Sequence, residues 1–185
     1  VNDYGVSVDG REPSSDVAEA VADEIRDAGG QAVPCADSVT SMAGGARVVQ
    51  TAVDTFGRLD GVVCVAGILR ERMLFNMAEE EWDPVIETHL KGTFTVFRAA
   101  SAVMRKAGGG RIINIGSGEA VMGSPISAVY AATKGAVSAW TRSIARAWAA
   151  GKGSAIALAP AGETPGAGRP RDFSRPEAPG LRGAE

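Results

Sequence analysis

A chain of 185 residues has the length of one domain, and its 45% hydrophobic and 22% charged residues are typical of globular proteins. The formal net charge of −3 gives no electrostatic reason to expect nucleic acid or an anionic membrane surface as a partner. No apolar run approaches the roughly 18 residues of a membrane span, and no signal peptide opens the chain, so we expect a cytoplasmic protein. Cys35 and Cys64 lack metal-site spacing and are expected to be buried free thiols.

The N-terminal half alternates short β-branched runs with amphipathic helical stretches. Ser14 or Ser15 is the expected N-cap of the first helix, which Gly29-Gly30 ends. Gly57 ends the second helix, and the strand that follows is almost entirely apolar, as in parallel strands covered on both faces. In chain order, the expected elements are a strand end at Val1–Asp3, a helix over 15–28 with Val17, Val21, Ile25 and Ala28 on one face, a strand at Gln31–Pro34, a helix at Ala43–Phe56 and a strand at Leu59–Val65.

The C-terminal half continues this alternation and then loses it. From Ala161 onward the chain is rich in Gly, Pro and Arg, with scarcely any apolar anchors. We therefore expect a partial catalytic domain over 1–164 and a mobile tail over 165–185. The expected elements before the tail are a long helical region at Met77–Lys106 with a break near Lys91-Gly92, a buried strand at Arg111–Ile115, a helix at Ala128–Ala149 and a last strand at Ala155–Ala159.

Repeated strand–helix units predict the α/β fold class, with a doubly wound parallel sheet and right-handed crossovers. In such sheets the ligand binds beyond the carboxyl ends of the strands. Residues able to carry chemistry are therefore sought directly after each strand.

Tyr130 and Lys134 stand four residues apart in an expected helix and share one face. An ammonium beside a phenol favours the phenolate and lowers the phenol pKa from about 10, as a tyrosine acid/base requires. Ser117 directly follows a strand, and the loop 118–127 leads to the tyrosine helix, so hydroxyl and phenol can converge on one carbonyl oxygen. The alternative makes Ser117 a turn residue and Lys134 a solvated charge.

Several motifs, in order along residues 1 to about 164, resemble the short-chain dehydrogenase/reductase family, whose fold is Rossmann-like. An ordered set of motifs is far more specific than any single one. Within the family, the resemblance is greatest to the hydroxyacyl-CoA dehydrogenase units of multifunctional β-oxidation enzymes. The matching segments are Phe56–Asp60, Ala66–Ile68, His89–Phe94, Arg111–Ser117 with Tyr130 and Lys134, and Ala159-Pro160 with Thr164.

The resemblance implies a role for each matching residue. Tyr130 would exchange a proton with the substrate oxygen, Lys134 would lower the pKa of Tyr130 and hold the nicotinamide ribose, and Ser117 would hydrogen-bond the substrate. Asp3 would bind the adenosine ribose and repel a 2′-phosphate, so NAD is expected over NADP; an ordinary loop aspartate is the alternative. The residues implied in cofactor binding are Asp3, Asp37 (at the adenine), Ala66, Gly67, Tyr130, Lys134, Pro160 and Thr164.

The chain departs from the family pattern in four places. Cys64-Val65 replaces two asparagines that brace neighbouring strands, and Pro160-Ala161 lacks the usual glycine. His89, the only histidine, replaces an asparagine that supports the catalytic lysine through water, and both a relay and a structural role remain open for it. The first strand, its Gly-rich phosphate turn and the last strand have no counterpart. We therefore expect an empty slot of roughly 9–10 Å, two strand spacings, between Val1–Asp3 and Leu59–Val65.

The leading hypothesis is an oxidoreductase that passes a hydride between NAD and a secondary alcohol or ketone, including 3-hydroxyacyl-CoA-like substrates, without a metal. One alternative is a catalytically inactive relative that acts as a structural or association module, and another is a sensor that binds NAD without turnover. A homo-oligomer through the helices at 77–106 and 128–149 is also expected. Their large apolar residues, which fit a plain core equally well, are Trp82, Phe97, Trp140 and Trp148.

Overall fold

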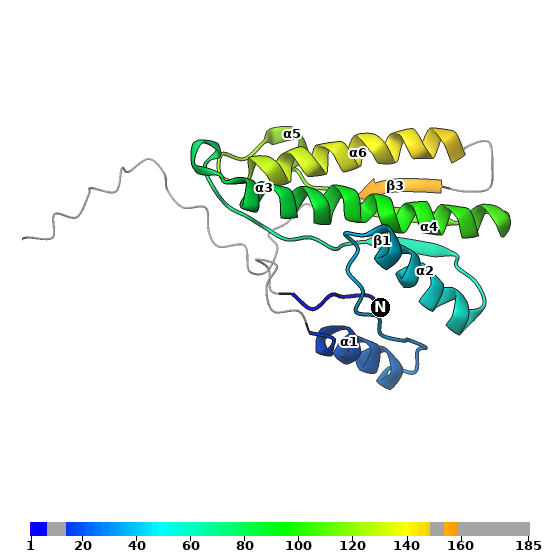
Figure 1. The fold of residues 1–185 in the computed structure, drawn as a ribbon. Helices are drawn as coiled ribbons and strands as arrows, with labels where there is room; N and C mark the ends of the chain where they lie inside the picture. Colours follow the sequence, from blue (N-terminus) through cyan, green and yellow to red (C-terminus); the bar gives the residue numbers. More distant parts are fainter. Residues whose placement is uncertain (7–13, 149–153, 159–185) are drawn as a thin grey trace, which may run out of the picture.

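The computed structural model describes residues 1–6, 14–148 and 154–158, and its centre is a parallel sheet of three strands in the order β1-β2-β3 (Figure 1). In the register of this sheet, Val62 lies opposite Ile112, and Ile113 lies opposite Ile156. The strands are β1 (Gly61–Cys64), β2 (Arg111–Ile115) and β3 (Ser154–Leu158). Helices connect these parallel strands, which confirms the doubly wound α/β class, here as a partial fold.

The helices lie close to their predicted positions. They are α1 (Asp16–Asp27), α2 (Met42–Phe56), α3 (Glu79–Ile86), α4 (Gly92–Lys106), the short α5 (Glu119–Met122) and α6 (Ala128–Trp148), with a 3-10 turn η1 (Leu74–Asn76) before α3. A π turn, η2 (Glu87–Lys91), joins α3 to α4 and accounts for the predicted break near Lys91-Gly92. π turns inside helices are frequent at functional sites. Within the described ranges, no helix is long and apolar enough to cross a bilayer.

Local signals set the ends of the first two helices. Ser41 Oγ accepts a 3.0 Å hydrogen bond from Gly44 N at the start of α2. Gly57 ends α2 with a φ of 72°, a left-handed conformation that glycine adopts without steric cost. Before α1, Ser14 rather than Ser15 supplies the side-chain acceptor, for Asp16 N at 3.1 Å.

The main core lies between the sheet and the helices α2, α4 and α6. Phe97 stacks on Trp140 with ring centroids 5.1 Å apart. On β2, Asn114 is fully buried and donates from Nδ2 to Thr141 Oγ1 at 2.6 Å. The buried apolar residues of this core are Val49, Val96, Phe97, Ala100, Met104 and Ile112. These contacts hold the sheet beneath α4 and α6.

The N-terminal segment does not join this sheet. Asn2 and Cys35 form an isolated parallel bridge, in which Cys35 N donates to Val1 O at 2.9 Å and Asp3 N donates to Cys35 O at 3.0 Å. The predicted strand at 31–34 does not form as a strand: Val1 N donates to Val33 O at 2.9 Å, but the bridge itself lies at Cys35. Figure 1 shows α1 beside this segment and away from α4 and α6.

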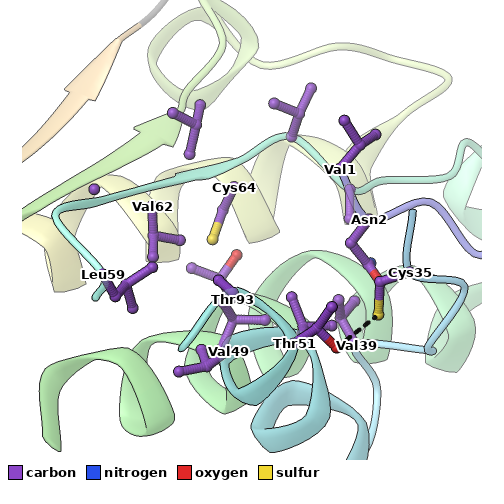
Figure 2. Close-up of a pocket in the computed structure, with 18 of the residues that line it drawn as sticks. Val1, Asn2, Cys35, Val39, Val49, Thr51, Leu59, Val62, Cys64 and Thr93 are labelled. Carbon is purple, nitrogen blue, oxygen red and sulfur yellow. Dashed lines mark hydrogen bonds between the residues drawn. The ribbon is translucent and has the colours of Figure 1, made fainter. Parts of the chain in front are cut away.

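A cavity of about 320 Å³ separates the Asn2–Cys35 bridge from β1. In Figure 2, Val62 and Cys64 reach it from one side and Asn2 and Cys35 from the other. Among the described residues β1 pairs only with β2, so its second edge has no backbone partner there. This arrangement agrees with the expected slot and excludes direct pairing of the two segments.

Two predicted apolar faces are exposed instead of buried. On α1, Ala18 and Ala22 are the buried residues, whereas the predicted face of Val17, Val21 and Ile25 is 37–44% exposed. On the β1 side, Val63 and Val65 are 58% and 66% exposed, so the prediction of a strand covered on both faces is wrong. The reason is the same in both cases: within the described part of the chain no element packs against these faces.

Candidate functional site

Residues predicted to be catalytic gather near the carboxyl ends of β1 and β2. Ser117 lies just beyond β2, Tyr130 and Lys134 lie in the first two turns of α6, and His89 lies in η2. The His89 and Tyr130 rings meet edge to face with centroids 5.1 Å apart. Lys134 Nζ lies 5.5 Å from the Tyr130 ring centroid. The fold thus brings side chains from three separate segments to one place.

Lys134 is buried, with 6% of its surface exposed, and its Nζ donates to Ile115 O at 2.8 Å. Burial lowers the pKa of its ammonium, because the charged form loses hydration. The interpretation of Lys134 as a solvated charge is therefore wrong. A buried ammonium tied to the last residue of β2 is fixed in direction.

The pKa of Tyr130 is raised, chiefly by burial of the phenol. The nearby Ser117 hydroxyl opposes this shift, and the nearby charge of Glu119 adds to it. The expected lowering of this pKa by Lys134 is not found, because the ammonium is directed at the Ile115 carbonyl. In this arrangement the phenol favours its protonated form.

His89 is buried, with 4% of its surface exposed, and its Nε2 lies 2.8 Å from Ile68 O and 3.1 Å from Ile68 N. One ring nitrogen serves only one of these as donor or acceptor, so the tautomer decides which bond forms. Nδ1 is buried without a hydrogen-bond partner among the described residues. Burial, followed by the weaker effect of Lys134, lowers the pKa of His89 to about 4, so the ring is neutral near pH 7.

Gly67 is required by the position of the His89 ring. A Cβ on residue 67 would lie 2.3 Å from His89 Cε1, far inside van der Waals contact. The backbone after β1 therefore approaches the imidazole as closely as glycine permits. Ala66 precedes this contact, so both residues of the predicted Ala66-Gly67 pair lie at the site.

The described residues fit the two ribose ends of a nicotinamide cofactor. Asp3 is exposed just after the Asn2 bridge and accepts from Gly5 N at 2.7 Å, which leaves its carboxylate with further acceptor capacity. At the other end, Tyr130 and the buried Lys134 offer a hydroxyl and an ammonium. No Gly-rich turn at a helix N-terminus, which would hold a pyrophosphate, occurs in the ranges that the structure covers.

The Asp37 carboxylate is occupied by an ion pair within the protein. Arg47 binds Asp37 Oδ1 through Nε at 2.7 Å and Nη2 at 2.6 Å, and this partner holds the pKa of the carboxyl below its usual value. The Asp37 backbone exchanges two 3.3 Å hydrogen bonds with the Asn2 side chain. Asp37 thus ties the N-terminal segment to α2. The predicted Pro160 and Thr164, like the tail 165–185, lie outside the described residues.

The two cysteines are free and half-buried. Burial raises the pKa of the Cys64 thiol to about 12, so this thiol is a weak nucleophile near pH 7. Across residues 1–6, 14–148 and 154–158 no group of three or more His, Cys, Asp or Glu side chains is placed to hold a metal ion.

Sequence reasoning missed Glu119, which the structure places beside the predicted residues. Its Oε2 accepts from Ser127 Oγ at 2.5 Å, and its backbone N donates to Ser117 Oγ at 3.2 Å. The loop 118–127 was predicted only as a connection between strand and helix. The available signal was a carboxylate two residues after a candidate catalytic serine.

Comparisons with known proteins identify the family of this chain. The family pattern described as short chain dehydrogenase matches residues 3–167. The peroxisomal multifunctional enzyme type 2 of Mus musculus is 43% identical over 134 residues, which are 72% of this chain and 18% of that protein. A hydroxyacyl-CoA dehydrogenase of Mycobacterium tuberculosis is 42% identical over 155 residues, covering 80% of this chain and 47% of that protein.

A short chain dehydrogenase from Mycobacterium avium has a similar crystal structure, with a TM-score of 0.79 and 43% sequence identity. The match covers 86% of this chain and 59% of that one. The chain therefore spans less than two thirds of the length of each of these relatives.

Proposed function

The chain belongs to the short-chain dehydrogenase/reductase family, and on that premise we propose that it passes a hydride between NAD and a secondary alcohol or ketone. The relatives described above include a hydroxyacyl-CoA dehydrogenase. The observation that carries the proposal is the convergence of Ser117, Tyr130 and the buried Lys134 beside β2. A structural helix would not need to bury an ammonium beside a phenol.

Each of these residues has a part in the proposed reaction. When bound, the nicotinamide cofactor supplies or accepts the hydride. Tyr130 gives its proton to the carbonyl oxygen during reduction, or takes one from the alcohol during oxidation. Ser117 donates a hydrogen bond to the same oxygen, and Lys134 binds the nicotinamide ribose. Asp3 binds the adenosine ribose and favours NAD over NADP, because its charge repels a 2′-phosphate.

His89 stands behind this group as a positioning residue. Its ring packs against Tyr130 and its Nε2 binds the backbone of Ile68, so it fixes the segment after β1 relative to the phenol. Its Nδ1, buried and without a partner among the described residues, is suited to hold a water molecule that links the ring to Lys134.

The proposed substrate is a 3-hydroxyacyl-CoA-like thioester or the corresponding ketone. One relative supports this class, because it is named as a hydroxyacyl-CoA dehydrogenase. The relative from Mus musculus is named as peroxisomal, so the cytoplasmic location expected for this chain stays a prediction.

We also propose a homo-oligomer formed through α4 and α6. Phe94 is 44% exposed, and an apolar hollow of about 190 Å³ lies beside it, lined by Phe97, Trp140 and Trp148. Light scattering on the purified chain tests this proposal, and a mass equal to one chain at all concentrations would contradict it.

The test of the proposed reaction is Tyr130→Phe, with Tyr4→Phe, the change at the only other tyrosine, as the matched control. Loss of the acid/base group should reduce NAD-dependent turnover of a 3-hydroxyacyl-CoA by roughly 10²–10⁴-fold, while NAD affinity changes little. The control should keep the parent rate. Residual activity within about tenfold of the parent would assign the proton transfer to another residue.

A second candidate function is an inactive association module. It is favoured by the cavity beside β1, which no element of the described residues fills. Calorimetry with NAD discriminates the two, because a module without a cofactor site should bind no NAD at any accessible concentration.

A further inference from the structure

We propose that Glu119 determines substrate specificity: its carboxylate, held by Ser127, excludes substrates that carry an anionic group within two bonds of the reacting carbon. The inference rests on the function proposed above, because it concerns the same site. It adds a preference for neutral keto esters and keto thioesters over free keto acids.

Contacts on both sides fix Glu119 at the start of α5, the short helix between β2 and α6. Its backbone N–H donates to Ser117 Oγ at 3.2 Å, and its Oε2 accepts from Ser127 Oγ at 2.5 Å. Ser127 is buried, directly precedes α6 and lies three residues before Tyr130, about one helical turn away. The carboxylate is therefore held on Ser127, one turn from the tyrosine that would contact the substrate oxygen.

The contact with Ser117 also directs the serine hydroxyl. A hydroxyl has one proton to donate and two acceptor positions, and the Glu119 N–H occupies one acceptor position. The Ser117 proton is then available to Tyr130 or to a substrate oxygen. The Ser127 hydroxyl, in contrast, is committed to Glu119 as a donor.

The charges around the phenol leave the Glu119 carboxylate unneutralised. Lys134 directs its ammonium at the Ile115 carbonyl, and His89 is neutral near pH 7. No Lys or Arg in the described ranges forms an ion pair with Glu119. Its charge reaches the phenol, because after burial, the main cause, it adds to the raised pKa of Tyr130. A second anion bound beside the phenol would be repelled, whereas a neutral ester would not.

Glu119→Gln tests the proposal, because glutamine keeps the size of the side chain and an oxygen that can accept from Ser127. In a Tyr4→Phe background Tyr130 is the sole tyrosine, so its ionisation can be followed directly by tyrosinate absorbance. Glu119→Gln should lower the Tyr130 midpoint, and Glu24→Gln, at an exposed position on α1, should leave it unchanged. An unchanged midpoint in Glu119→Gln would overturn the inference. This titration needs no turnover, so it remains decisive if the proposed function fails.

The second measurement compares a β-keto acid with its methyl ester as substrates. The parent should prefer the ester, and Glu119→Gln should raise kcat/KM for the acid by roughly tenfold or more while the ester changes by less than about threefold. An unaltered ratio of the two kcat/KM values would overturn the specificity role. Absence of turnover with every substrate in both variants would instead contradict the proposed function.

Discussion

The strands β1 and β2 have similarly apolar sequences, but β2 includes buried residues, whereas those of β1 are exposed or half-buried. On β2, Ile112 and Asn114 are 1% and 0% exposed, because strands flank them on both edges and α4 and α6 cover them. On β1, an equally apolar run leaves Val63 more than half exposed beside a cavity. Burial is therefore set by the elements that surround a strand and not by the strand's own composition.

The largest expected effect on stability is in the packed side of the molecule, the core around β2, α4 and α6. Phe97→Ala removes a ring that stacks on Trp140 and is 2% exposed, so it should lower the free energy of unfolding by about 3–5 kcal/mol. Urea denaturation measures the change. A loss below about 1 kcal/mol would mean that the packed side is as loosely covered as the side around the cavity.

The second effect appears when the pH is lowered. The folded pKa of His89 is about 4, below the usual 6.5, so between these values the unfolded chain binds a proton that the folded chain does not. Stability should be fully present above about pH 6.5 and decline as the pH falls toward 4, by up to about 3 kcal/mol. His89→Asn, which cannot titrate, should flatten this part of the stability profile. If the stability of parent and variant depended on pH in the same way, the His89 imidazole would be exposed to water in the folded protein.

A smaller effect is expected from the buried pair on β2 and α6. Thr141→Val keeps the shape of the side chain but leaves Asn114 Nδ2 without its acceptor, which should cost about 1–3 kcal/mol. Thr55→Val, at an exposed position in α2, is the control and should stay within about 0.5 kcal/mol. Equal stability of the two variants would show that water replaces the lost partner.

The smallest effect on stability is expected on the open side of the sheet, at β1. Val63→Thr should change the free energy of unfolding by less than about 0.5 kcal/mol, because the side chain is already 58% exposed. A small change would agree with the exposure of β1. A cost above about 1.5 kcal/mol would show that another chain or segment covers this face in solution.

Local patterns were sufficient to predict α2, α6 and β2 to within one residue, because caps and periodicity lie within each element. The exposed face of α1 could not be predicted, since its apolar spacing is that of a helix that packs on a neighbour. In the site, the spacing of Tyr130 and Lys134 correctly predicted a shared helix face. The direction of the ammonium toward Ile115 depends on a distance between separate elements, which no single-sequence pattern contains.

The π turn at Glu87–Lys91 makes the chain sensitive to deletion at this point. A π turn carries one more residue than an α-helical turn, and each residue rotates a helix by about 100°. Thr93 Oγ1 donates to His89 O at 2.6 Å and so bonds a carbonyl within this wider turn. Removing one residue from 87–91 would restore α-helical geometry, but it would rotate α4 relative to α3 and turn Phe97 away from Trp140. A one-codon deletion here would therefore disturb the histidine and the core together, whereas in an exposed loop of the same length it would be absorbed.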